Sequence, residues 1–230
     1  MHGERNPISR PGRGSSQHLV AQRPAYPSTV TIRPRLLITW TGRDLERVLG
    51  ALGTELQDGA IELPSARIEL DRTDLPAGQA RLRVEALSPG SGQDARAPGS
   101  LDLAAVGWAT VELERAARDV GGAWESAAHD RLLGAAAWRS PVDHPATLLL
   151  EPNTEGRLAG ALARYGEGPI VIYLRLGDLG QVAARMRARP GAGPLGEEWL
   201  IPGPNPAGPF LILAADPDAP PNADRVPSQP

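Results

Sequence analysis

The residues best suited to chemistry in this chain are two histidines and the acidic side chains near them. Asp130, Asp143 and Glu151 lie close in sequence to His129 and His144, so a site of two histidines and one carboxylate can be drawn. The spacing of these residues matches no zinc or iron pattern. Both histidines also lie in segments with the composition of turns or loops. We therefore interpret them as solvated loop residues.

The motifs of other common chemistries are absent from the sequence. The chain has no cysteine, which excludes thiol catalysis, disulfides and thiolate metal sites. It has neither a Gly-x-Ser-x-Gly nucleophile elbow nor a phosphate-binding Gly-Lys-Ser/Thr loop. Glu151 and Glu167 could act as general bases, but each lies at the end of an expected element, where a charge is ordinary. No single residue therefore identifies a reaction.

Charge and hydropathy exclude two classes of partner. The net charge is −3 with a pI near 5.8, which disfavours nucleic acid, and all 24 basic residues are arginine. No apolar run approaches the roughly 20 residues that cross a bilayer. The arginine-containing N-terminus lacks the apolar segment of a secretory signal. We expect a soluble cytoplasmic protein that binds neither nucleic acid nor membrane.

The clearest local pattern covers residues 147–186 and reads strand, helix, strand, helix. A short apolar run at 147–151 ends at Pro152, and apolar residues at helical spacing follow at 154–165. Gly166 and Gly168 end that helix. A β-rich run at 170–176 then leads to a second amphipathic helix, which opens at Asp178.

This strand-and-helix pattern occurs three times. The segments 36–52, 106–120 and 170–186 each place a strand before a helix that opens with an acidic residue and leucine, at Asp44, Glu112 and Asp178. Short strands follow each helix, at 60–62, 66–71 and 80–86, at 132–139 and 146–150, and at 197–201 and 209–214. The sequence therefore predicts an α+β fold built from three βαβββ modules.

Composition divides the chain into five parts. Residues 1–28 and 216–230 are rich in Pro and polar residues and are predicted to be disordered tails. Residues 88–100 have the composition of a linker. A divergent βαβββ-like module is expected at 30–87, and a pair of modules at 101–215.

Three short motifs in the second half resemble a known family. Leu150-Glu151-Pro152, Gly166-Glu167-Gly168 and Asp178-Leu179 occur in the order found in the epimerase and glyoxalase branch of the vicinal oxygen chelate superfamily. The resemblance covers about 106–214. It implies paired βαβββ modules whose sheets curl into a cup around a small ligand. Residues 30–87 resemble a third, more divergent module.

The resemblance does not extend to the family's metal ligands. The four positions that we align with the ligands are Val106, Leu148, Val171 and Ile212. A shift of one residue gives Ile170, Gly107, Leu149, and Leu211 or Leu213, and none of these side chains ligates a metal. We therefore expect no metal and no cofactor in this pair of modules.

Strand alternation predicts which side chains face the cup. If Val171 faces the cup, Tyr173 and Arg175 on the same strand face it too. If Val106 occupies the same position in its own module as Val171 does, then Trp108 and Thr110 also face the cup. The candidate ligand-pocket residues are Val106, Trp108, Thr110, Leu148, Val171, Tyr173, Arg175, Phe210 and Ile212. They describe an apolar pocket with one anion-binding arginine. The alternative is a filled core with Arg175 paired to a carboxylate at the rim.

Three functional hypotheses follow. The first is a metal-free protein of the vicinal oxygen chelate type that binds a small, largely apolar molecule in the cup, as the drug-sequestering bleomycin-resistance-like members do. The second is an isomerase, lyase or dioxygenase-type enzyme whose metal ligands are displaced. The third is a structural or regulatory protein with a plugged cup.

The odd number of modules raises the question of what covers the first one. Its expected strands have one charged and one apolar face, and the apolar face must be buried. A homodimer that pairs two copies of 30–87 about a twofold axis would bury it. Packing of 30–87 against 101–215 within one chain is the alternative.

Overall fold

The computed structural model describes residues 35–216 except 42–43, 53, 55, 72–80, 88–100, 142–144, 154, 178 and 204–207. The predicted tail at 1–28 and the linker at 88–100 lie outside the described residues, as does the predicted tail at 216–230 apart from Asp216. His144, Asp143 and Asp178 lie outside them too.

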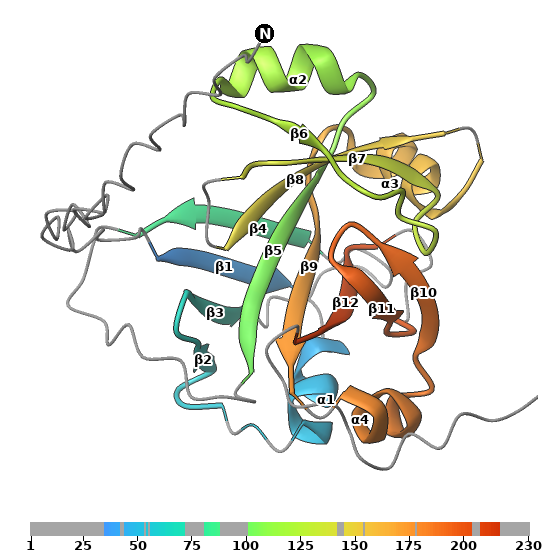
Figure 1. The fold of residues 1–230 in the computed structure, drawn as a ribbon. Helices are drawn as coiled ribbons and strands as arrows, with labels where there is room; N and C mark the ends of the chain where they lie inside the picture. The colour runs from blue at the N-terminus through green and yellow to red at the C-terminus, as the bar shows by residue number, and fades with distance from the viewer. Residues whose placement is uncertain are drawn as a thin grey trace, which may run out of the picture. The chain divides into compact units, whose positions relative to one another are not determined.

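The second and third predicted modules form one eight-stranded sheet. The second comprises β5 (Asp102–Ala109), α2 (Leu113–Val120), β6 (Glu125–Ser126), β7 (Ala135–Arg139) and β8 (Ala146–Pro152). After α3 (Arg157–Tyr165), the third comprises β9 (Gly168–Leu176), α4 (Leu179–Met186), β10 (Arg189–Gly193), β11 (Gly196–Leu200) and β12 (Phe210–Ala215). The strand order is β10-β11-β12-β9-β5-β8-β7-β6, with β5 and β9 antiparallel at the centre (Figure 1).

These two modules have the same internal topology. In each, the first strand is parallel to the last, so that β5 pairs with β8 and β9 pairs with β12. The two remaining strands then extend the sheet outward as antiparallel neighbours. The α+β fold of repeated βαβββ modules that the sequence predicts is confirmed.

The first predicted module differs in its last strand. It contains β1 (Leu36–Thr41), α1 (Asp44–Ala51), β2 (Ala60–Glu62), β3 (Ala66–Asp71) and β4 (Arg81–Ala86), in a sheet of order β2-β3-β1-β4. Here β3 is the strand parallel to β1. A single bridge between Gln57 and Ala60 stands beyond β2, in the place of an outermost strand of this sheet. β4 pairs antiparallel with the other edge of β1, as β5 does with β9.

Burial explains why β9 has so few polar residues. Ile170, Val171, Ile172, Tyr173 and Leu174 are all at most 5% exposed. Val171 and Tyr173 belong to a core on one face of the large sheet, whereas Ile172 and Leu174 belong to a second core on the other face. A strand covered on both faces is expected to be a continuous apolar run rather than an alternating one.

The second core joins the two sheets within one chain. It unites Ile38, Trp40 and Ile68 of the small sheet with residues of β5, β9 and β12, and α1 contacts α4 (Figure 1). The apolar face of the first module is therefore covered by the same chain, which is the intrachain alternative to the homodimer. The oligomeric state itself stays a prediction.

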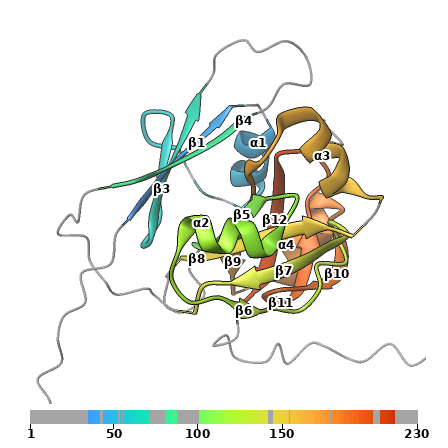
Figure 2. The same cartoon turned by 90° about the horizontal axis from the view of Figure 1, so that it is seen from above.

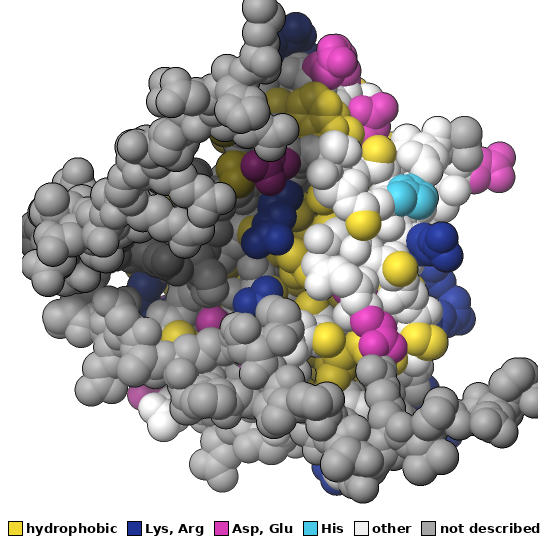
Figure 3. Space-filling model, in the orientation of Figure 1, with side chains coloured by type: hydrophobic (Ala, Val, Ile, Leu, Met, Phe, Trp, Pro, Cys, Tyr) yellow, Lys and Arg dark blue, Asp and Glu magenta, His cyan; other side chains and the backbone are white. Residues whose placement is uncertain are grey.

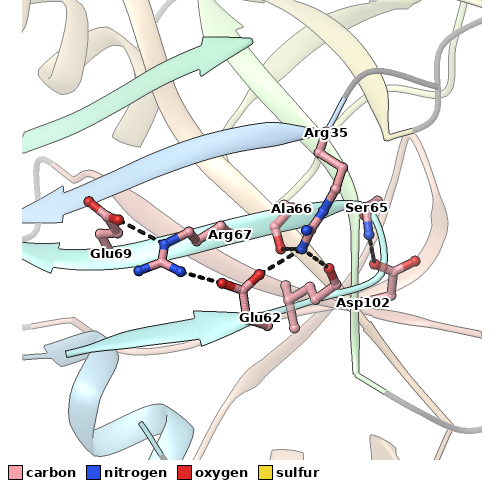
Figure 4. A network of polar contacts seen from close by, with 8 residues as sticks. Arg35, Glu62, Ser65, Ala66, Arg67, Glu69 and Asp102 are labelled. Carbon is pink, nitrogen blue, oxygen red and sulfur yellow. Dashed lines mark hydrogen bonds and ion pairs between the residues drawn. The ribbon is translucent and has the colours of Figure 1, made fainter. Parts of the chain in front are cut away.

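A buried aspartate fixes the contact between the sheets. Asp102, which is 2% exposed, accepts hydrogen bonds from the Ser65 hydroxyl (2.6 Å) and the Ser65 N–H (3.3 Å) (Figure 4). Arg35 binds the same β2–β3 turn by donating to Glu62 Oε2 (2.7 Å) and to the Leu63 carbonyl (3.0 Å). The start of β5 and the turn of the small sheet are thereby held together by charge-assisted hydrogen bonds.

Candidate functional site

The large sheet has two faces with different surroundings. We call inner face the one that carries Gly107, Leu148, Val171, Tyr173 and Ile212. We call outer face the one that carries Val106, Trp108, Leu149, Ile172 and Leu174. The first core lies on the inner face together with α3, and the outer face carries α2, α4 and the small sheet.

The inner face is filled by its own side chains. Leu148, Val171, Tyr173 and Ile212 are each fully buried, and Phe210 is 5% exposed. All five belong to one core with Leu158 and Ala161 of α3. These five predicted pocket residues do come together, but they form packed core rather than the lining of an open space.

The predicted orientation of β5 is wrong by one residue. Gly107 pairs with Val171 across the strands, and Val106 pairs with Ile172. Residues directly opposite each other in neighbouring strands share a face, so Gly107 belongs to the inner face and Val106, Trp108 and Thr110 do not. A Cβ at position 107 would collide with Val171 Cγ1 and lie 2.7 Å from Leu150 Cδ1.

The centre of the inner face does not fit the metal that the family resemblance implies. The residues at its centre are Gly107, Leu148, Val171 and Ile212, which offer no donor side chain. Among the described residues, no group of three or more His, Cys, Asp or Glu is placed to hold a metal ion.

Two buried carboxyl groups lie at one end of the inner face. Asp130 is fully buried and accepts hydrogen bonds from the Tyr173 hydroxyl (2.8 Å) and from the N–H groups of Leu132 and Leu133 (both 2.9 Å). Burial raises its pKa despite these donors. The Tyr173 pKa also lies well above its ordinary value, first because of burial and then because of the Asp130 charge.

Glu198 is the second of these groups and was not among the predicted site residues. It is fully buried on β11, its Oε1 accepts the Leu195 N–H (2.8 Å), and its Oε2 has no hydrogen-bond partner among the described residues. Burial, with the Asp130 charge as a smaller cause, raises its pKa to about 8. The sequence contains a signal for it, because adjacent Glu197 and Glu198 must point to opposite faces of one strand.

An open cavity lies on the outer face. It has a volume of about 580 Å³. Its walls come from β5, β8, α2 and the small sheet, and its apolar residues include Val84, Ala86, Val106, Trp108, Ala116 and Leu149. Helix α2 packs on β8 beside it (Figure 2). Figure 3 shows hydrophobic and arginine side chains along the recess that runs down this face from α2.

Polar groups converge at one end of this cavity. Thr110, Arg115 and Glu167 all line it. Glu167 Oε1 accepts hydrogen bonds from the Thr110 hydroxyl (2.7 Å), the Val111 N–H (2.8 Å) and Arg115 Nη2 (2.5 Å). Chiefly because of Arg115, the pKa of Glu167 falls to about 2. A cavity with apolar walls and a few convergent polar groups is the usual form of a small-molecule site.

The remaining candidates lie elsewhere. Arg175 is half-buried, lies opposite Asp102 near the end of β9 and is not among the described residues that line the cavity. His129 is exposed and hydrogen-bonds to the Asn153 amide (3.0 Å). Glu151 Oε2 accepts the Leu113 N–H (2.8 Å) and so caps α2. None of these three residues is part of the outer-face cavity.

No protein-family model matches the sequence, and a search of curated proteins finds no relative. Among solved structures, methylmalonyl-CoA epimerase from Mycobacterium tuberculosis is similar with 20% identity over 49% of this chain and 86% of that chain, with a TM-score of 0.42. A variant of methylmalonyl-CoA epimerase from Streptomyces coelicolor, in complex with 2-nitronate-propionyl-CoA, is 20% identical over 50% of this chain and 96% of that chain, with a TM-score of 0.40. A hypothetical protein from Bacillus halodurans is 14% identical over 54% of this chain and 99% of that chain, with a TM-score of 0.43. Similarity at this level assigns neither a ligand nor an activity to this chain.

No helix among the described residues is long and apolar enough to cross a membrane.

Proposed function

We propose that this protein binds a small, largely apolar molecule in the outer-face cavity and does so without a metal. The observation that carries the proposal is the contrast between the two faces. The side chains at the centre of the inner face are at most 5% exposed, whereas the outer face holds a cavity of about 580 Å³ with apolar walls. Ligand pockets typically measure roughly 300–1,000 Å³.

The lining of the cavity supports an aromatic or alicyclic ligand. Trp108 is partly exposed on β5 and presents a large apolar surface, and Val106 and Leu149 extend that wall. Indole rings stack on other aromatic rings with a gain of roughly 0.5–1.5 kcal/mol beyond the area they bury. Val84 and Ala86 of β4 form the opposite wall, so the small sheet contributes directly to the site.

This proposal places the site differently from the sequence-based hypothesis. The predicted pocket residues Val106, Trp108 and Thr110 line the cavity, whereas Leu148, Val171 and Tyr173 are packed in the inner core. The binding of a small apolar molecule is retained, and its place moves from the cup to the opposite side of the same strands.

A pair of β4 variants tests the proposal. Ala86 is exposed and lines the cavity, and its neighbour Glu85 is exposed and points to the other face of the small sheet. With 1-naphthaleneacetamide as the probe and calorimetry as the measurement, Ala86→Trp should weaken binding at least about tenfold by filling the cavity. Glu85→Trp should change affinity less than about twofold. Equal affinity of Ala86→Trp and wild type would contradict the proposal.

A further inference from the structure

The polar end of the outer-face cavity has the composition of a carboxylate site, and a carboxylate of the chain already occupies it. Three donors, the Thr110 hydroxyl, the Val111 N–H and the Arg115 guanidinium, converge on the single oxygen Glu167 Oε1. The Thr110 oxygen also accepts the Glu112 N–H (3.2 Å), and its hydroxyl lies closer to Glu167 Oε1 (2.7 Å) than to the Glu112 carbonyl (3.3 Å). Thr110 is 3% exposed, so this donor is built into the cavity end.

The fold does not need Glu167 to cap the adjacent helix. The first N–H of α2 is already satisfied by Glu151, from the end of β8. Glu167 instead binds the Val111 N–H, which precedes the helix. Its side chain is 40% exposed and comes from the turn between α3 and β9. Withdrawal of the Glu167 carboxylate would therefore leave the helix capped and the core intact.

A second cavity offers the carboxylate another position. It measures about 300 Å³, shares Glu167 and Gly168 with the first cavity, and is also lined by Arg81, Arg164 and Tyr165. Both arginines are exposed. A rotation of the Glu167 side chain across the turn would exchange Arg115 for this second basic environment. Glu167 thus borders both cavities.

We infer that the ligand of the outer-face cavity is an aromatic or other apolar carboxylic acid, whose carboxylate displaces Glu167 from Thr110, Val111 and Arg115. The inference rests on the proposed function and adds the chemical class of the ligand. The apolar body lies against Trp108 and Val106, and the acid group accepts the three hydrogen bonds. Glu167 is then an internal competitor that keeps the donors satisfied while the cavity is empty.

Two matched probes and four variants of the full chain test the inference. 1-Naphthaleneacetic acid and 1-naphthaleneacetamide share the same apolar body and differ in the charge of the polar group. Glu167→Ala should tighten binding of the acid about tenfold, the effect of removing a competitor for charge-assisted hydrogen bonds. Glu167→Gln should give a smaller gain. Both variants should bind the amide within about twofold of wild type.

Two further variants control for charge and for the donors. Arg115→Met, combined with Glu167→Ala, should abolish the preference for the acid. Glu125→Ala removes an exposed carboxylate outside the cavity and should leave both affinities unchanged. Far-UV circular dichroism and the thermal midpoint establish that each variant is folded. If Glu167→Ala is unfolded, the comparison is made with Glu167→Gln.

The possible outcomes separate this inference from the proposed function. An equal gain for acid and amide in Glu167→Ala would show only that the cavity widens and would overturn the carboxylate site. An unchanged affinity for the acid would overturn it as well. Binding of the amide that Ala86→Trp abolishes, without any acid preference in Glu167→Ala, would retain the proposed function and reject the inference. If neither probe binds any variant, both fail.

Discussion

The two faces of the large sheet use the same strands in opposite ways. On the inner face, aliphatic side chains and Tyr173 pack into a core with α3. On the outer face, the small sheet and α2 leave a cavity of about 580 Å³ against Trp108 and Leu149. The first module thus does more than cover an apolar surface, because its strand β4 supplies one wall of the candidate site.

The pairing of the first strand of a module also differs between the two sheets. β9 meets β5 of the neighbouring module, and β1 meets β4 of its own module. The small sheet therefore completes its pairing locally and is free to pack against the outer face. The first module thus packs against the second and third modules within one chain, and the oligomeric state stays a prediction.

Substitutions of two consecutive leucines on β8 should give the largest effects that test this contrast between the two faces. Leu148 is fully buried in the inner core, and Leu149 faces the outer cavity at 3% exposure. Leu148→Ala should lower the free energy of unfolding by about 4 kcal/mol, through lost transfer energy and the void that it leaves. Leu149→Ala should cost about 2 kcal/mol, because its side chain already borders empty space. Urea denaturation measures the free energy of unfolding of both variants. Equal losses of this free energy would contradict the conclusion that the inner face is more tightly packed than the outer face.

The pH dependence of stability tests the buried acid on the inner face. Because the folded-state pKa of Glu198 is raised to about 8 from an ordinary 4.5, the folded state holds this proton more tightly than the unfolded state. The stability that the protonated group contributes is fully present below about pH 4.5 and is lost as pH rises toward 8.

Glu198→Gln removes this dependence. The variant should exceed wild type in stability by about 2–3 kcal/mol at pH 8.5, and the difference should shrink toward pH 4.5. Asp130 and Tyr173 interact with the Glu198 charge, so the comparison reports the titration of Glu198 together with its effect on these two groups. Denaturation curves across this range provide the measurement. A difference that does not vary with pH would mean that Glu198 is not buried in its protonated form.

The repeated modules could be predicted because each carries a local signal. The β-rich run at 170–176 is β9 (Gly168–Leu176), and the helix predicted at 154–165 is α3 (Arg157–Tyr165). The partner of a strand has no such signal. The strand at 80–86 is present as β4, but pattern alone does not specify which edge of β1 it joins.

The site could be predicted only in part, for a reason that lies in β5. Both Val106 and Gly107 are compatible with a buried strand, and a shift of one residue exchanges the two faces. The pairing of Gly107 with Val171 is what assigns Gly107 to the inner face and Val106 to the outer face. The cavity itself needs β4 and α2 to lie over Trp108, and no periodicity in the sequence encodes that contact.

The position of a bound ligand tests the outer-face cavity most directly. Crystals of the full chain with a bromonaphthaleneacetic acid would show the bromine by anomalous scattering. We expect one bromine site on the outer face, between Trp108 and β4, with the carboxylate at Thr110 and Arg115. A bromine site on the inner face, among Gly107, Val171 and Phe210, would contradict ligand binding in the outer-face cavity.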